Sequence, residues 1–164
     1  MTVMEPVPRE RRGDFVVTMD GLGEEACRDL LLRHRFGRVA MLDPHAGLTI
    51  HPVNYLVVDD AVLFRTGAGS ALDRMCDGAD VAFEVDGTEA ATQSGWSVLV
   101  RGPASRVTDQ CTIDRLSDTA VRPWAPGWRD CWIRIEPRQV TGRIIRRDRQ
   151  SRTGATHLPY MGPS

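Results

Sequence analysis

One stretch of the chain carries much of the information about its fold, and it reads LTIHPVNYLVVDDAVLFRT from Leu48 to Thr66. Two runs rich in β-branched and aromatic residues flank the pair Asp59-Asp60, and an acidic pair in this setting favours a tight turn. Pro52 interrupts the first run, so the first strand is expected to bend or bulge there. The stretch therefore predicts an antiparallel hairpin whose second strand covers residues 61–66.

Similar patterns along the rest of the chain predict more strand than helix. Alternation of apolar and polar residues indicates the strands. They are expected over residues 38–42, 48–58, 61–66, 79–86, 96–107, 131–136 and 140–147. Short helices are expected over residues 23–35, 70–77 and 109–120. Because strands follow strands without regular crossover helices, the fold class is β-rich α+β, a small antiparallel barrel of six to seven strands with a few short flanking helices.

A glycine-rich loop follows the second strand of the hairpin. Arg65 and Thr66 precede Gly67-Ala68-Gly69-Ser70, and a helix is expected to begin directly afterwards. Two spaced glycines, an arginine and hydroxyl groups suit a phosphate cradle, although the ending of a P-loop is missing. The alternative is a turn in which Ser70 caps the helix. Taken alone, the segment favours the capped turn.

The composition of the 164-residue chain is that of a soluble globular protein. Hydrophobic residues make up 41% and charged residues 26%, and no apolar run reaches the length of a membrane span. The net charge of −1 indicates no overall nucleic-acid footprint. Because the N-terminus also lacks an apolar signal core, we expect a cytoplasmic protein that binds neither nucleic acid nor membrane.

The sequence contains no lysine, so arginine supplies every permanently charged cationic side chain. Schiff-base chemistry on lysine is therefore excluded, and a phosphate group would have to be held by arginine, hydroxyl or backbone N–H groups. The four cysteines are widely spaced and predict neither a disulfide framework nor a zinc site. Cys27 and Cys76 fall on expected helices and are assigned to the core.

Four segments occur in one order along the chain: Gly37 to Ala40, Pro52 to Tyr55, Phe64 to Ser70, and Gly95 to Gly102. Together they resemble the pyridoxamine 5′-phosphate oxidase-like FMN-binding split-barrel family. The nearer likeness is to small actinobacterial-type members related to nitroimidazole reductases, and it covers about residues 20–147. We therefore expect a split-barrel domain over residues 20–147, a flexible N-terminal arm over 1–19 and a C-terminal tail over 148–164.

This resemblance implies an FMN site at the interface of a homodimer. The residues that match the flavin contacts of the family are Val53, Asn54, Arg65, Thr66, Gly67, Gly69, Ser70, Trp96, Ser97, Val98 and Trp124. By resemblance, the first two lie along the flavin ring and the next five lie beneath the ribityl chain and the phosphate. Residues 96–98 reach the flavin from the partner subunit, and Trp124 lies in a loop that closes over the pocket.

The residues themselves leave some of these roles open. Arg65 alternates with Phe64, so one side chain points into the barrel and the other points outward. Trp96 is equally well explained as a core residue or a dimer contact. Asn54 is equally well explained by a hydrogen bond that satisfies a bulge near Pro52.

Ala71 departs from the family pattern, which places a basic residue, often lysine, at or next to this position. A charge-assisted contact to phosphate contributes about 1.5–3 kcal/mol, so its loss would weaken FMN binding about tenfold or more. Arg65 or Arg74 could substitute for the missing cation. The alternatives are a weak FMN site, a site for a deazaflavin, or a site that has lost its ligand.

The expected function is that of an FMN-dependent oxidoreductase, which transfers hydride at flavin N5 to or from an unidentified small molecule. A true pyridoxamine phosphate oxidase is not expected, because no second phosphate site rich in basic residues can be assigned. His51 is the nearest candidate for an acid–base group, while Glu84 and Asp86 are assigned to solvent or ion pairs. The alternative functions are a non-catalytic FMN-binding or sensory dimer and a deazaflavin-dependent reductase.

Overall fold

The computed structural model describes residues 10–12, 15–76, 78–117 and 130–149, which form one sheet and three short helices. In chain order the elements are β1 (Glu10–Arg12), β2 (Phe15–Leu22), α1 (Glu24–Arg33), β3 (Phe36–Asp43), β4 (Gly47–Val58), β5 (Ala61–Thr66), α2 (Ala71–Met75), β6 (Ala79–Glu89), β7 (Ser94–Arg106), α3 (Gln110–Ser117), β8 (Cys131–Ile135) and β9 (Gln139–Arg149). Each expected strand is present, with ends that differ from the prediction by at most three residues.

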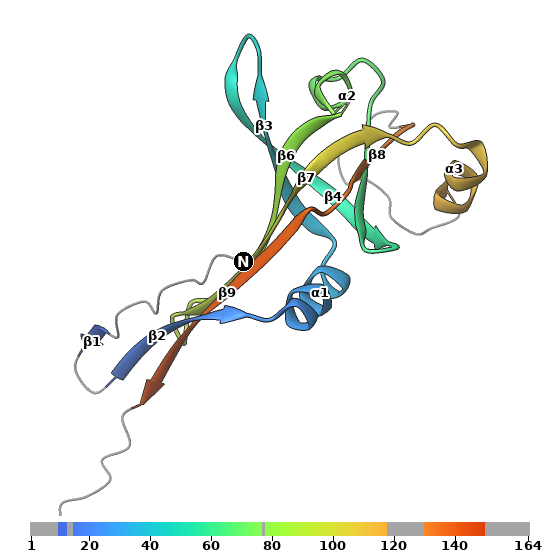
Figure 1. Ribbon diagram of the computed structural model, residues 1–164. Coiled ribbons are helices and arrows are strands. Elements are labelled where there is room, and N and C mark those ends of the chain that lie inside the picture. The colour runs from blue at the N-terminus through green and yellow to red at the C-terminus, as the bar shows by residue number, and fades with distance from the viewer. Residues whose placement is uncertain (1–9, 13–14, 77, 118–129, 150–164) are drawn as a thin grey trace, which may run out of the picture.

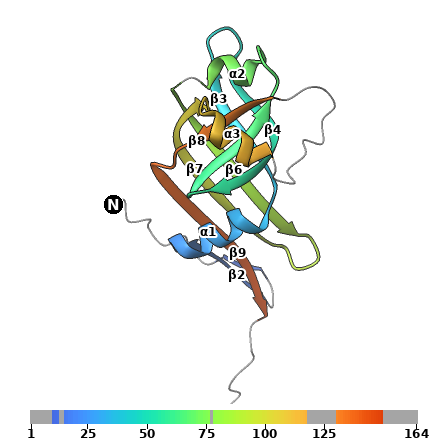
Figure 2. The same ribbon diagram turned by 90° about the vertical axis from the view of Figure 1, so that its right-hand side faces the viewer.

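Six strands close into a barrel in the order β7-β6-β3-β4-β5-β8, and pairing between β8 and β7 completes the ring. All of these pairs are antiparallel. Figures 1 and 2 show α1 and α2 near opposite ends of the barrel, with α3 at its side. The structure therefore confirms the predicted β-rich fold and its antiparallel barrel. None of the helices in the described part of the chain is long and apolar enough to cross a bilayer.

The β4–β5 hairpin forms as the sequence predicts. Asp59 and Asp60 have positive φ angles of 50° and 63°, the backbone that a two-residue hairpin turn requires and that aspartate tolerates. The β3–β4 register runs without a skip through Pro52, so no bulge interrupts this ladder. Instead β4 changes partner, pairing with β3 up to Asn54 and with β5 from Tyr55 onward.

Further strands extend the sheet beyond the barrel, and we call β1, β2 and β9 the sheet extension. β9 pairs with residues 95–101 of β7, and all eight residues of β2 pair with β9. Figure 1 shows this sheet extension running away from the barrel. Part of β2 lies in the segment that we expected to be a flexible arm, and β9 continues to Arg149, inside the expected tail. The run Phe15-Val16-Val17-Thr18 has strand-forming residues, and pairing with β9 keeps it in the sheet.

Gly102 lies where β7 passes from the sheet extension to the barrel. Residues 95–101 of β7 pair with β9, whereas residues 104–106 pair with β8. A Cβ atom on Gly102 would come 1.8 Å from the carbonyl oxygen of Glu136, in the β8–β9 connection. The N–H of Glu136 donates to the carbonyl of Pro103 at 3.0 Å, which holds this connection against β7. Only glycine fits such a close approach of two backbones.

The apolar core has two parts. The larger part fills the barrel, as expected for a barrel of this size, and it includes the buried Cys27 and Cys76, as predicted. The smaller part comprises Leu56, Ala61, Leu63, Leu116 and Trp132, contributed by β4, β5, α3 and β8. Because Val62 and Phe64 belong to the first part and Ala61 and Leu63 to the second, β5 is buried on both faces.

Candidate functional site

The candidate site begins where β4 and β5 separate. Tyr55 and Phe64 form the last pair of the β4–β5 ladder. Asn54 comes directly before this pair on β4, and Arg65 comes directly after it on β5, so both lie at the same end of the ladder. Beyond it, Asn54 pairs with Phe36 of β3, and Arg65 pairs with Trp132 of β8. The Asn54 side chain also donates to the carbonyl oxygen of Arg35 at 3.4 Å. It therefore forms a hydrogen bond with the backbone, as expected, but the β3–β4 ladder has no bulge at this point.

Arg65 lies on the outer face of β5, opposite to the face that carries Phe64. Phe64 is fully buried in the barrel core, as the alternation of the strand predicts. The guanidinium carbon of Arg65 lies 5.4 Å from the centre of the Trp132 ring, a cation–π distance. Among the described residues, the buried Nε of Arg65 has no hydrogen-bond partner. A buried N–H without a partner is rare in proteins, so Arg65 Nε is a candidate donor to a bound group.

The loop after β5 is built around a pair of hydroxyl groups. Thr66 is buried, and its hydroxyl lies 2.8 Å from that of Ser70. Ser70 also accepts the N–H of Asp73 at 3.1 Å and is the N-cap of α2. The capped turn that the sequence offered as an alternative is therefore present. Gly69 has a φ of 71°, a conformation that favours glycine, and open space where its Cβ would lie.

Asp73 completes this loop, and the sequence analysis did not identify it. Its carboxylate is 3% exposed and accepts the N–H of Gly69 at 2.7 Å. Arg106, at the end of β7, donates from Nη2 to the other carboxylate oxygen. The bond from Gly69 and the contact with Arg106 hold the pKa of Asp73 below its usual value, although burial opposes this. The spacing Ser70-x-x-Asp73 is that of a capping box, and this signal could have located the residue.

Arg74 contacts the next peptide group of the same loop. Its Nη1 donates to the carbonyl oxygen of Gly69, while the N–H of Gly69 donates to Asp73. Two neighbouring side chains of α2 thus fix the conformation of Gly69. As a result, the Gly69 amide expected to face a phosphate is already hydrogen-bonded, whereas Arg65 Nε is not.

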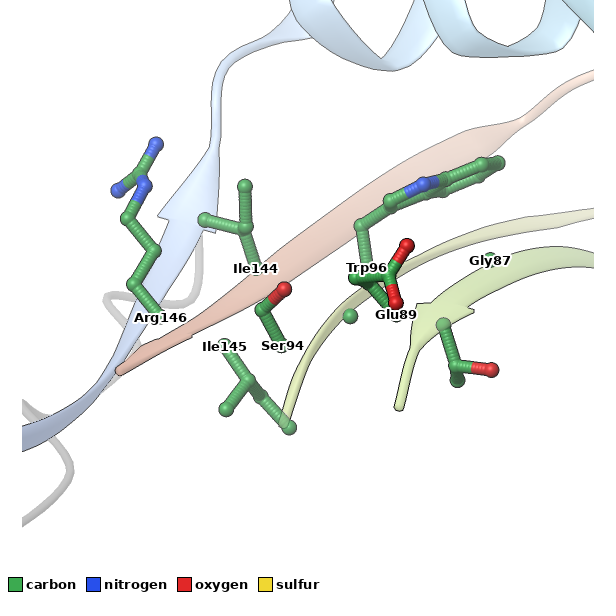
Figure 3. Close-up of a pocket in the computed structure, with 9 residues that line it drawn as sticks. Gly87, Glu89, Ser94, Trp96, Ile144, Ile145 and Arg146 are labelled. Carbon is green, nitrogen blue, oxygen red and sulfur yellow. The ribbon is translucent and has the colours of Figure 1, made fainter. Parts of the chain in front are cut away.

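A second group of predicted residues lies on β7. Val98 is fully buried in the barrel core, and Ser97 points to the opposite face of the strand. Trp96 is half-buried, and its ring centre lies 4.6 Å from that of His34, the residue after α1. Trp96 lines a groove of about 410 Å³ together with Glu89, Ser94 and Ile144. Figure 3 shows how these side chains lie. Trp96 therefore packs at the edge of the core of its own chain and keeps one side accessible.

A single chain keeps these two groups apart. Residues 96–98 lie in the part of β7 that pairs with β9, whereas Arg65 lies opposite β8. Val53 is buried in the barrel core, so its side chain is not available at the surface. Trp124 lies outside the described residues, and its predicted role stays a prediction. The structure thus places Asn54, Arg65 and the Thr66–Ser70 loop at one end of the β4–β5 ladder, with Arg65 and Thr66 on opposite faces of β5, and it places Trp96 elsewhere.

The other polar residues considered from the sequence offer little acid–base chemistry. Asp86 forms an ion pair with Arg38, as predicted for its strand face. The Nε2 atom of His51 is buried and has no hydrogen-bond partner among the described residues. No group of three metal-ligating side chains occurs in the part of the chain that the structure describes.

Comparisons with known proteins identify the fold and the relatives of this chain. The model of the family described as pyridoxamine 5′-phosphate oxidase matches residues 23–144. The uncharacterized protein Rv0080 of Mycobacterium tuberculosis is 38% identical over 129 residues, which cover 74% of this chain and 82% of that protein. These matches confirm the family resemblance that the sequence motifs indicated.

Two solved structures show the same architecture. The FAD binding protein from Mycobacterium smegmatis is 34% identical and superposes with a TM-score of 0.67, covering 77% of this chain and 98% of that chain. A candidate 5-nitroimidazole antibiotic resistance protein from Bacteroides thetaiotaomicron is 13% identical, with a TM-score of 0.62 and coverage of 84% and 96%. At that identity the second likeness concerns the fold alone.

Proposed function

Because the chain belongs to the pyridoxamine 5′-phosphate oxidase family, we propose that it is a flavin-binding protein whose site lies where β4 and β5 separate. The observation that carries this proposal is the buried Nε of Arg65, which has no partner among the described residues and lies one residue from the Thr66–Ser70 loop. The 34% identical relative that binds FAD supports a flavin as the ligand.

The residues present fit the part that FMN and FAD share, a flavin ring with a ribityl phosphate. Arg65 offers a charged donor beside an aromatic ring, and Thr66 and Ser70 offer hydroxyl groups. Gly69 leaves open space on the side where a Cβ would stand. Its amide, however, is committed to Asp73, so the phosphate would be held by side chains more than by this N–H. FMN remains our first expectation, with FAD and a deazaflavin as the alternatives.

A bound flavin would supply hydride transfer at N5 to or from a small molecule. The chain itself contributes the placement of the ring, through the backbone of Val53 and Asn54, and a positive charge near the phosphate from Arg65. The substrate would be a small molecule other than pyridoxamine phosphate, because the described residues show no second cluster of basic side chains at this site.

We further propose that two chains form a homodimer, in which the β7 segment of residues 96–98 of each chain reaches the flavin of the other, with Val98 contributing its backbone because its side chain is buried. The β3–β4 hairpin supports this proposal. Leu48 is 83% exposed, and Leu42 lies directly opposite it while Ile50 lies on the same face. Exposed apolar side chains gathered on one sheet face are typical of a protein interface.

A non-catalytic flavin-binding or sensory dimer is the second candidate function. It is favoured by Asp73 and Asp86, two described carboxylates that are held by other groups of the chain. Asp73 is tied to Gly69 and Arg106, and Asp86 is tied to Arg38.

The absorbance spectrum of the purified protein tests the proposed function directly. A flavin spectrum as isolated, or quenching of FMN, FAD or deazaflavin fluorescence on titration, is the expected result. A colourless protein that quenches none of them at high micromolar concentration would overturn the proposal. Oxidation of NADH or NADPH by the loaded protein, in the presence of common electron acceptors, distinguishes an oxidoreductase from a sensory dimer.

A further inference from the structure

Helix α2 begins with alanine at position 71, next to the Ser70 cap, and the chain has no lysine to supply a charge there. Arg65 approaches from the outer face of β5 and stacks over Trp132. Two other arginines, Arg74 and Arg106, reach the loop itself through contacts with Gly69 and Asp73. The positive charge at this loop therefore comes from three separate elements, α2 and β7 as well as β5.

Arg106 is held by an unusual partner. The Asp73 carboxylate is 3% exposed, while the Arg106 side chain is 48% exposed. A buried carboxylate is stable only when it is paired and hydrogen-bonded, and Asp73 meets this condition with Gly69 and Arg106. Breaking the pair would leave a buried charge without compensation, so Arg106 is anchored at one nitrogen more firmly than a surface arginine.

The free side of Arg106 remains available to a ligand. A guanidinium group carries five N–H donors, and the described contacts of Arg106 use one of its nitrogens. The carboxylate that anchors Arg106 also bonds the N–H of Gly69, so the guanidinium lies next to the loop. Asp73 offsets one of the two positive charges of Arg106 and Arg74, so these three side chains together leave a net positive charge beside the loop.

We propose that Arg106, positioned by Asp73, supplies together with Arg74 the positive charge for the flavin phosphate that other family members place next to Ser70. Arg106 is the phosphate-binding residue in this arrangement, and Asp73 is a positioning residue that acts through it. The inference rests on the proposed function, since it concerns the phosphate end of the same flavin site.

The test compares FMN with riboflavin, which has the same ring but no phosphate. Dissociation constants are measured by fluorescence quenching for the wild type, R106Q, R106K and D73N. R106Q is expected to weaken FMN binding about tenfold and to leave riboflavin binding unchanged, and R106K is expected to restore part of the loss. D73N is expected to weaken FMN binding as well, because Arg106 loses its anchor. FMN binding should fall with salt more steeply in the wild type than in R106Q.

R101Q serves as the matched control, since Arg101 is an exposed arginine of the same strand that bonds Gln139 and lies away from the loop. It should bind both flavins like the wild type.

An unchanged ratio of FMN to riboflavin affinity in R106Q would overturn the inference. Tighter FMN binding by D73N would also overturn it, because Asp73 would then act as a charge that repels the phosphate. If circular dichroism shows that D73N does not fold, the FMN and riboflavin affinities of R106Q alone decide the inference. A wild type that binds neither flavin would overturn the proposed function and this inference with it, whereas equal binding of both flavins would overturn this inference only.

Discussion

The indole of Trp96 lies directly over the backbone of Gly87, its cross-strand partner on β6. A Cβ atom built on Gly87 would come 2.6 Å from the indole nitrogen, and the ring centre of His34 lies 4.6 Å from that of the indole. The tryptophan is thus held between a strand position that requires glycine and the end of α1.

Gly87→Ala is therefore expected to displace the indole and to destabilise the fold by about 1–3 kcal/mol, the usual effect of overpacking. Urea denaturation followed by circular dichroism measures the loss, and near-UV circular dichroism reports the change around the indole. Gly21→Ala is the matched control, because that strand glycine has no atom within 4 Å of its would-be Cβ. Equal stability of the two variants would show that Trp96 does not depend on Gly87.

Ser70→Ala should weaken the start of α2. The substitution removes the N-cap acceptor for the Asp73 N–H and the hydroxyl partner of Thr66. We expect a loss of about 1 kcal/mol in the free energy of unfolding, together with weaker FMN binding. Ser117→Ala, at the exposed end of α3, removes a hydroxyl that donates to the carbonyl of Ile113 in the described part of the chain, and it should change neither quantity. A Ser70→Ala protein with unchanged FMN affinity would count against a role of the hydroxyl in binding.

The contribution of Asp73 to stability should depend on pH. Its pKa in the folded protein lies below the ordinary value of 3.8, because the Gly69 N–H and Arg106 stabilise the carboxylate. The unfolded chain then binds more protons in acid, so the stabilisation is complete above about pH 5 and is lost as the pH falls through 3.8 toward the folded pKa. Denaturation at pH 7 and pH 3 should show a larger loss for the wild type than for D73N. D114N, which alters an exposed carboxylate of α3, should keep the pH dependence of the wild type.

Ile50→Glu tests the expected dimer. Ile50 lies on the exposed apolar face of the β3–β4 hairpin and has no place in the barrel core. A charge on this face should convert a dimer into a folded monomer, which sedimentation velocity and circular dichroism together would show. Leu32→Glu, a partly exposed apolar position on α1, should leave the association state unchanged. A wild-type protein that sediments as a monomer would contradict the proposed homodimer.

The barrel could be predicted because its strands alternate and its turns carry distinctive residues. The pair Asp59-Asp60 and the run Ala61–Thr66 gave one hairpin with correct bounds. The sheet extension was missed at β2, because a strand that pairs with a segment far along the sequence leaves no local signal beyond its β-branched residues.

Some features of the candidate site could also be predicted from the sequence, and others could not. The outward direction of Arg65 and the cap at Ser70 follow from local rules of strands and helices. The contact between Asp73 and Arg106 joins residues 33 positions apart, and only the closed barrel brings α2 to the end of β7. No pattern within one segment could have indicated that pair.

Gly102 gives β7 a mechanical role. One continuous strand serves both the barrel and the sheet extension, and the β8–β9 connection is seated on its backbone at the point of transfer. A hinge at this point would have to break the hydrogen bond from Glu136 to Pro103, which holds the β8–β9 connection against the strand. We therefore expect the barrel and the sheet extension to open as one unit, and hydrogen exchange should show the amides on both sides of Gly102 opening together.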